Sequence, residues 1–473
     1  MSESLDERPA SERAQVPDIA TEPIPAHVWR LAAVVVFGAF MSTLDASLVG
    51  IGLRTIAEDL GATLATTQWV VTAYLVALAV SLPACGWACR RFGARRIWIG
   101  SMAAFTLASA LCAFAPSVAL LVFFRVLQGL AAGLLVPAGQ TIIGRAAGPH
   151  RLGRVMSTLG IAVICAPALG PTVGGLMLQY LHWGWLFGIN VPLGIVAVAL
   201  AVRILPRDEP SEPASIDLPG IIALGGGISL IVYGVGEASS SGSLLHLTAW
   251  LPLVIGVGAL AVYGWLLTRP RTHIIDVGLY RNHVFLAACS AVFANGALLF
   301  GSMLILPLWF QAQGQSIIGT GLSLIAFGVG GIISMPIGGR LTDRYGGDLI
   351  GLVGAVGALA ATIPFVFVDG DTNAVVVQAL LLVRGVAIGL LAMPVFTVAY
   401  ASVAREQLPD ATSFANIAQR VGGAIGSAVV TIAVARSGFA AGTGWLVGAA
   451  VLAVLMTALL VVVRRRGHPI NRK

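Results

Sequence analysis

The stretch SLPACGWACRRFG, residues 81–93, has a second copy further along the chain, SMPIGGRLTDRYG at residues 334–346. The copies align without a gap, and one serine, one proline and two glycines keep their places. At one aligned position the charge is inverted, because Arg90 stands where the second copy has Asp343. A motif repeated in this way indicates an internal duplication of the chain.

Each copy is followed by a second repeated stretch. The two members of this second pair are separated by nearly the same number of residues as the first pair. RVLQGLAAGLLVP at residues 125–137 is matched by RGVAIGLLAMP at residues 384–394. One short glycine-rich match can arise by chance, but two matches in the same order indicate two equivalent halves. We therefore expect the chain to consist of two duplicated halves of six helices each.

The composition predicts an integral membrane protein. Of the 473 residues, 57% are hydrophobic and 10% are charged, whereas soluble domains carry about 25% charged residues. The 57 glycines allow helices to approach closely in a bilayer, where packing replaces the hydrophobic effect between helices. The net charge of +7 does not indicate nucleic acid binding, because the arginines lie in short loops between apolar runs.

Fourteen apolar runs are candidates for transmembrane helices, each of which needs about 20 residues. They start near residues 31, 66, 97, 118, 153, 184, 216, 247, 283, 318, 349, 373, 412 and 442. The seventh and eighth runs have no counterpart in the repeat, so we expect them to form an inserted pair. The predicted all-α integral membrane organisation comprises a disordered tail (1–30), an N-terminal six-helix bundle (31–205), a linker with two extra transmembrane helices (206–282), a C-terminal six-helix bundle (283–465) and a basic tail (466–473).

The arginines are distributed unevenly between the loops. They gather in alternate loops and in the C-terminal tail, while the other loops carry few, namely Arg54 and Arg436. By the positive-inside rule both termini then lie in the cytoplasm, as an even number of spans requires. The sequence therefore predicts a multi-pass protein of the cytoplasmic membrane, and we expect it to be a monomer in the lipid bilayer.

Further motifs resemble those of the major facilitator superfamily, specifically its fourteen-helix drug:proton antiporters. The matching stretches are LDASLVGIGL (44–53), QWVVTAY (68–74), GIAVICAPALGPTVGG (160–175), WGWLFGINVPLG (183–194), LPLWFQAQGQS (306–316) and ANIAQRVGGAIG (415–426). The resemblance covers nearly the whole chain after residue 30. It implies two bundles that rock about a central cavity and export a small amphipathic molecule with the proton gradient as the energy source, without a cofactor.

Asp45 is the one acidic residue placed deep inside a predicted span. An unpaired carboxylate in hydrocarbon costs several kcal/mol, so Asp45 needs a partner or a polar cavity. By helix geometry Arg125 enters the fourth span to a similar depth, roughly 10 Å from its outer end. We predict that Arg125 and Asp45 share a polar network that couples transport to protons; the alternative is that each only braces neighbouring helices.

The duplicated motif corresponds, in the resemblance, to a gate in which an acid meets a helix end in the other half. A helix N-terminus carries a partial positive charge, which attracts an acid and repels an arginine. Arg90 cannot replace the acid at such a site, so we expect a one-sided clasp, that is, a contact between the halves that relies on Asp343 alone. The alternative is that Arg90 pairs with a new carboxylate, which the sequence does not identify. The gate residues are Gly86, Arg90, Arg91, Gly93, Arg95, Arg96, Gly339, Asp343, Arg344 and Gly346.

Two further groups of residues are candidates for the cavity. The exporter signature of the resemblance consists of Gly170, Pro171, Gly174 and Gly175. Proline bends a helix and glycines give it a flat face, so the signature seals or hinges the cavity, or serves packing alone. The polar candidates, each either a cavity group or a bond between helices, are Gln68, Gln128, Asn295, Arg384, Gln419 and Arg420. For Arg384 the partners considered are backbone carbonyls or an anionic group of the substrate.

The sequence thus predicts a proton-coupled exporter of amphipathic drugs or toxic compounds. A dedicated exporter of one metabolite or antibiotic fits the same residues, and a membrane sensor without transport is a third hypothesis, raised by Arg90. We do not expect an enzyme, since the sequence shows no nucleophile–base pair and no metal-ligand cluster. It also has no phosphate-binding loop with lysine, which argues against direct use of ATP.

Overall fold

The computed structural model describes residues 23–148, 151–208, 216–241, 246–269, 274–368 and 372–467. All regular elements in these ranges are helices. The first part of the chain forms α1 (Ala26–Asp59), α2 (Leu64–Thr67), α3 (Trp69–Ser81), α4 (Ala84–Phe92), α5 (Ala94–Ala113), α6 (Val118–Ala147), α7 (Leu152–Tyr180), α8 (Trp185–Gly188) and α9 (Asn190–Ile204). The rest forms α10 (Leu218–Ser241), α11 (Leu247–Leu267), α12 (His283–Ala312), α13 (Ile317–Ser323), α14 (Ile325–Tyr345), α15 (Gly347–Thr362), α16 (Ala374–Ala401) and α17 (Leu408–Gly467), with short 3₁₀ segments η2 (Val277–Arg281), η3 (Ile363–Val366) and η4 (Arg405–Gln407).

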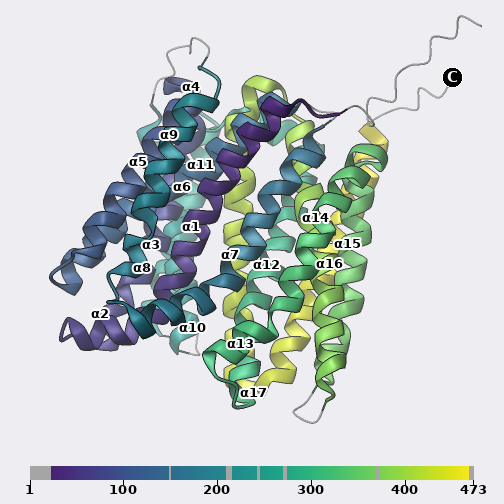
Figure 1. Cartoon of the computed structure of the whole chain (residues 1–473). Coiled ribbons are helices and arrows are strands. Elements are labelled where there is room, and N and C mark those ends of the chain that lie inside the picture. The colour runs from purple at the N-terminus through teal and green to yellow at the C-terminus, as the bar shows by residue number, and fades with distance from the viewer. Residues whose placement is uncertain are drawn as a thin grey trace, which may run out of the picture.

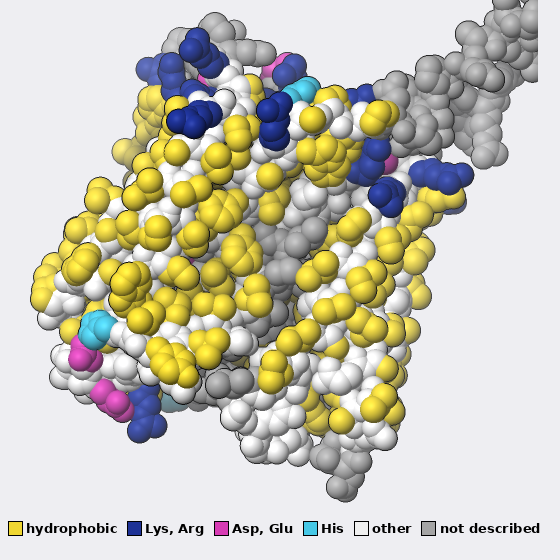
Figure 2. Space-filling model, viewed as in Figure 1, with side chains coloured by type: hydrophobic (Ala, Val, Ile, Leu, Met, Phe, Trp, Pro, Cys, Tyr) yellow, Lys and Arg dark blue, Asp and Glu magenta, His cyan; other side chains and the backbone are white. Residues whose placement is uncertain are grey.

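The long helices run side by side, and the start of α1 and the end of α17 lie at the same end of the molecule (Figure 1). Most Lys and Arg side chains on the visible face gather at this end, while hydrophobic side chains cover the flanks (Figure 2). We call it the arginine-rich end; it includes Arg90 near the end of α4 and Arg464 near the end of α17. Such a separation of basic ends from apolar flanks is typical of membrane proteins.

Twelve helices in the described ranges are long and apolar enough to cross a membrane. Their outward faces carry large exposed side chains such as Leu107, Ile195 and Val254. Exposed side chains of this size are stable where hydrocarbon replaces water around the protein. The prediction of a multi-pass, all-helical membrane protein is confirmed.

The predicted number of fourteen spans is not confirmed. The twelve candidate spans do not include α7, which has 29 residues, and they include α17 as one helix. α17 has 60 residues and is interrupted at Gly438, where φ is 80° and ψ is −179°, so that it consists of two helical segments. The second segment begins close to residue 442, the predicted start of the last span.

The duplicated motif produces the same backbone turn twice. Gly93 separates α4 from α5 with φ 92° and ψ 141°, and Gly346 separates α14 from α15 with φ 93° and ψ 140°. A positive φ of this size is accessible to glycine and strained for other residues. The internal repeat that the sequence indicates is therefore present in the three-dimensional structure.

The helices pack in two groups that share several contacts. In the N-terminal half α1 packs along α7, and α3 and α5 pack on α6. In the C-terminal half α12 packs along α17, and α14 and α15 pack on α16. α7 also packs on α14, and α17 also packs on α4 and α6, so these helices join the halves. The α10–α11 pair packs together, with α10 against α3 and α17.

Both ends of the chain differ slightly from the predicted boundaries. α1 begins at Ala26, inside the predicted tail of residues 1–30, and α17 continues to Gly467, past the predicted end of the second bundle at residue 465. Residues 1–22 and 468–473 lie outside the described residues. The apolar periodicity of a span therefore locates its middle better than its ends.

Candidate functional site

Asp45 and Arg125 form an ion pair inside the N-terminal half. Arg125 Nη1 donates to Asp45 Oδ2 at 2.6 Å, and neither side chain is exposed. The pair joins α1 to α6, two helices that pack together. The predicted contact between these two residues is confirmed, and it is direct.

The carboxylate of Asp45 is bonded by two more side chains. Gln128 Nε2 donates to Asp45 Oδ1 at 3.0 Å, and Asn190 Nδ2 of α9 donates to the same oxygen at 2.7 Å. Gln128, one turn of α6 after Arg125, also donates to Ser109 Oγ at 2.7 Å. Gln128, a polar candidate from the sequence, thus bonds to side chains of α1 and α5. Asn190 was missed although it lies within the quoted stretch WGWLFGINVPLG.

The guanidinium of Arg125 is held on several sides. Its Nε donates to the carbonyl oxygen of Val70 at 2.9 Å, and Nη1 also donates to Gln128 Oε1 at 2.7 Å. The guanidinium lies 3.9 Å from the ring centroid of Tyr74, close enough for a cation–π interaction. Tyr74 and Ser109 were not identified from the sequence, because hydroxyl groups are common on helices that pack in membranes.

The geometry makes the charge of Asp45 and the local packing depend on each other. Removing one partner of a buried ion pair typically costs about 3–5 kcal/mol, because the remaining charge has no counter-charge. The ion pair between Asp45 and Arg125 therefore stabilises the contact between α1 and α6.

The second copy of the duplicated motif contacts a helix start in the other half. Asp343, near the end of α14, accepts hydrogen bonds from the backbone N–H of Gly153 at 2.8 Å and from Arg154 Nε at 2.8 Å. Gly153 and Arg154 form the first turn of α7, where the partial positive charge of the helix stabilises an acid. The predicted clasp on Asp343 is confirmed as a contact.

The first copy also makes a clasp, so the prediction of a one-sided clasp is wrong. Arg90 forms an ion pair with Asp410 in the first turn of α17, and its Nη2 donates to the carbonyl oxygen of Ile274 at 3.1 Å. Asp410 is 1% exposed and also accepts from the backbone N–H of Asp276 at 2.8 Å. Burial lowers the pKa of Arg90, and the Asp276 carboxylate opposes this. In this clasp the acid lies at the start of α17 and the arginine lies on α4.

Glycines of the motif allow these close approaches. A Cβ at Gly86 would overlap the carboxylate of Asp410, and one at Gly339 would meet Ser157 Oγ at 2.6 Å. The backbone N–H groups of Arg95 and Arg96 donate to the carboxylate of Asp208 at 2.9 and 3.1 Å, at the start of α5. The exposed members of the motif are Arg91, Arg96 and Arg344.

A third contact between the halves was not foreseen from the sequence. Gln140 Oε1 of α6 accepts from Tyr400 Oη of α16 at 2.9 Å and from Asn416 Nδ2 of α17 at 2.5 Å. All three side chains are buried. Next to them, the hydroxyl groups of Thr141 and Thr412 lie 2.9 Å apart across the same interface. Polar residues scattered over distant helices gave no pattern that would identify this interface.

The exporter signature packs α7 on α1. A Cβ at Gly170 would overlap Ser47 Oγ, and one at Gly174 would meet Leu48 Cδ2 at 3.2 Å. Gly175 is partly buried, and the side chain of Pro171 lies outside the described residues. The glycines therefore serve close packing, and a hinge at Pro171 remains a prediction.

We expect Gly170→Val to reduce the yield of folded protein by at least about fivefold, because overpacking costs about 1–3 kcal/mol. The yield is measured as the monodisperse fraction after solubilisation. Gly100→Val is the matched control, since a Cβ at Gly100 meets nothing within 4 Å. Equal yields for the two variants would contradict the packing role of Gly170.

The remaining polar candidates lie in different environments. Gln68 is exposed at the junction of α2 and α3, so the structure places it outside the interior predicted for it. Asn295 is fully buried on α12, and Gln419 is partly buried on α17. The guanidinium of Arg420, also partly buried, lies 5.6 Å from the ring centroid of Phe300. Arg384 is fully buried on α16, and its Nη2 donates to Ser302 Oγ at 2.6 Å.

Among the described residues, no group of three or more His, Cys, Asp or Glu side chains is placed to hold a metal ion.

Comparison with protein families gives the chain its class. Residues 35–427 match the model of the Major Facilitator Superfamily. The chain belongs to the major facilitator superfamily. The resemblance to this superfamily is thereby confirmed. As a member of a transporter family, this major facilitator is a transporter and not an enzyme.

Two curated major facilitators are similar over most of their length. The Multidrug resistance protein B homolog of Mycobacterium tuberculosis is 34% identical over 431 residues, which cover 90% of this chain and 79% of the relative. The Multidrug export protein EmrB of Escherichia coli is 30% identical over 411 residues, covering 83% of this chain and 77% of the relative. Among solved structures, the proton:xylose symporter XylE has a TM-score of 0.67 at 14% identity, over 91% of this chain and 95% of XylE, which shows a shared fold alone.

Proposed function

We propose that this major facilitator exports amphipathic drugs or other toxic compounds across the cytoplasmic membrane in exchange for protons. The buried Asp45–Arg125 pair carries the proposal, because it places a titratable carboxyl inside the N-terminal half. Relatives that are named multidrug resistance and multidrug export proteins support the substrate class. The proton gradient supplies the energy, and no cofactor takes part.

In the proposed cycle, Asp45 takes a proton when the two halves open to the outside. Its negative charge disappears, and the hydrogen bonds from Arg125, Gln128 and Asn190 weaken. The rearranged contact between α1 and α6 favours opening to the other side, where Asp45 loses the proton. A difference of one pKa unit between the two states corresponds to about 1.36 kcal/mol of coupling.

The clasps at the arginine-rich end support a state that is closed on that side. Arg90–Asp410, Asp343 with the start of α7, and Gln140 with Asn416 all join the two halves. By the positive-inside rule we place this end, with both termini, in the cytoplasm. The described state is then closed to the cytoplasm, and opening requires all three contacts to break.

We also propose fourteen spans in this orientation. α7 and the second segment of α17 complete the count, because a span needs about 20 residues and both are longer. The α10–α11 pair is then the insertion between two six-helix bundles, with the bundle boundaries predicted from the sequence. A monomer suffices for this mechanism, because both members of the ion pair come from one chain.

The proposal is tested in inside-out vesicles that contain the purified protein and an acidified lumen. We expect neutral, cationic or acidic lipophilic probes to accumulate at least about tenfold in the lumen, since a gradient of one pH unit corresponds to about 1.4 kcal/mol. A proton ionophore should abolish the accumulation. Accumulation that persists after the ionophore, or none for any probe, would rule out proton-driven export.

A further inference from the structure

Arg384 is the counterpart of Arg125 in the second half, but it has no acidic partner equivalent to Asp45. Asp45 is the twentieth residue of α1, and Ser302 is the twentieth residue of α12, the first helix of the second half. Arg384 Nη2 donates to Ser302 Oγ at 2.6 Å, just as Arg125 donates to Asp45 at 2.6 Å. The duplicated halves thus build the same contact twice, with a hydroxyl group in place of a carboxylate in the second half.

The charge of Arg384 has no counter-charge among the described residues. Its side chain is fully buried, and its Nε and Nη1 have no hydrogen-bond partner there. The described acids after residue 283 all lie at helix ends or in a connection; they are Asp343, Asp348, Glu406 and Asp410. Three of them are already paired, with Arg154, Arg464 and Arg90. A buried guanidinium in this position is costly unless a negative group reaches it.

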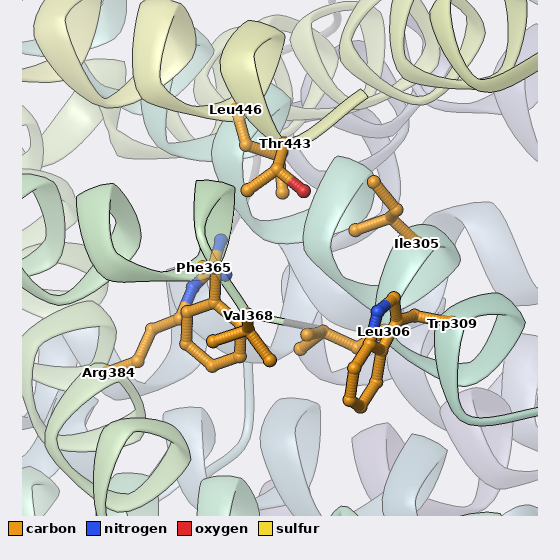
Figure 3. A pocket seen from close by; sticks show the side chains of 8 residues that line it. All are labelled: Ile305, Leu306, Trp309, Phe365, Val368, Arg384, Thr443 and Leu446. Carbon is orange, nitrogen blue, oxygen red and sulfur yellow. The ribbon is translucent and has the colours of Figure 1, made fainter. Parts of the chain in front are cut away.

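A small cavity borders the guanidinium of Arg384. Figure 3 shows Arg384 and Phe365 on one side of it and Ile305, Leu306 and Trp309 on the other. Val368, Thr443 and Leu446 complete the lining, which is mainly apolar. The volume of about 10 Å³ is close to the minimum for one water-sized group. The cavity therefore has room for one oxygen atom of an anionic group, and the rest of the same molecule must lie outside it.

We propose that Arg384 binds the acidic group of an anionic amphipathic substrate, such as a carboxylate. This inference rests on the proposed function and names a substrate class for it. A carboxylate oxygen in the cavity would accept hydrogen bonds from the free N–H groups of Arg384, and charge-assisted bonds of this kind are about twice as strong as neutral ones. The apolar walls weaken screening and suit the lipophilic part of the molecule. A small inorganic anion carries the same negative charge as a carboxylate. The test must therefore distinguish binding of an organic acid from binding of an inorganic anion.

The test measures the melting temperature of the purified full-length protein with benzoate, with its neutral analogue benzamide, and with chloride. Ionic strength is held constant with gluconate, a carboxylate whose hydroxylated chain does not suit the apolar lining of the cavity. We expect benzoate to raise the melting temperature by at least about 2 °C at saturation, because a ligand that binds only the folded state stabilises it. Benzamide and chloride should give smaller shifts. An equal shift with benzamide, or a shift with chloride but not with benzoate, would overturn the assignment.

Three variants connect the shift to the site. Ser302→Asp supplies the missing acid, so benzoate should no longer raise the melting temperature, whereas the uncharged and similarly shaped Ser302→Asn should retain the shift. Arg384→Gln should also lose the benzoate shift. If this variant does not fold, the comparison of Ser302→Asp with Ser302→Asn still tests the proposal. A full benzoate shift in Ser302→Asp would overturn the proposal. Because binding is measured without a gradient, a failed vesicle assay with an intact shift would contradict only the proposed function.

Discussion

We expect Asp45→Asn to lower ionophore-sensitive accumulation by at least about tenfold, the accumulation that a gradient of one pH unit can drive. The amide keeps the shape of the side chain and can still accept a bond from Arg125, but it cannot take up a proton. Export is measured as ionophore-sensitive accumulation in inside-out vesicles. Glu58→Gln is the matched control, because Glu58 lies on the same helix, is exposed and pairs with Arg54 one turn earlier. That variant should export like the wild type.

A second variant separates lost coupling from lost stability. Asp45→Asn leaves Arg125 charged and buried without a counter-charge, which typically costs about 3–5 kcal/mol. The double variant Asp45→Asn/Arg125→Gln removes both charges, so its melting temperature should recover most of the loss. Export should remain absent in the double variant. Restored export together with restored stability would mean that the pair is only a structural brace.

The second large effect is expected from reversing the charge at the clasp. Arg90→Asp places a carboxylate against Asp410, and like charges held together at an interface cost several kcal/mol. We expect the arginine-rich end to open, so that Cys89 on α4, which is buried in the closed state, reacts with maleimide at least about tenfold faster. Each 1.4 kcal/mol of shift toward the open state corresponds to a factor of ten. Cys289 on α12, also buried, serves as the internal reference, and both are quantified by mass spectrometry.

The double swap Arg90→Asp/Asp410→Arg tests whether the two residues act on each other. It restores the ion pair with reversed polarity, and Cys89 should regain most of its protection. The recovery should be incomplete, because an arginine in the first turn of α17 opposes the helix dipole by about 0.3–1 kcal/mol. If the swap is as reactive as the single variant, Arg90 and Asp410 do not form the clasp.

The sequence predicts those site residues whose depth in the membrane can be counted along a helix. Asp45 and Arg125 are rare charged residues in long apolar spans, so their depth follows from counting residues, and their contact follows from equal depth. Gln128 was predicted only as a cavity group or a bond between helices, and its contact with Asp45 did not follow from the sequence. Asn190 gives no such signal, because an amide near the start of a helix is common. Its role is visible only when α9 is packed against α1.

The contacts between the halves are harder to foresee, because they join residues that are far apart in the chain. Asp410 resembles an ordinary acid in the first turn of a helix, which the dipole alone would explain. Arg90, 320 residues earlier, resembles part of a basic loop. Only the folded chain shows that one neutralises the other, which is why a one-sided clasp was the wrong expectation. The same holds for Ser302, whose importance appears only beside Arg384.

The most direct measurement is the proton flux itself, compared between the wild type and Asp45→Asn in the same inside-out vesicles. Adding the best exported probe to wild-type vesicles with an acidic lumen should raise the luminal pH, because protons leave as the probe enters. The variant should bind the probe and show no change in luminal pH beyond that of protein-free vesicles. A probe-dependent rise of the same size in Asp45→Asn would contradict the role of this carboxyl in coupling.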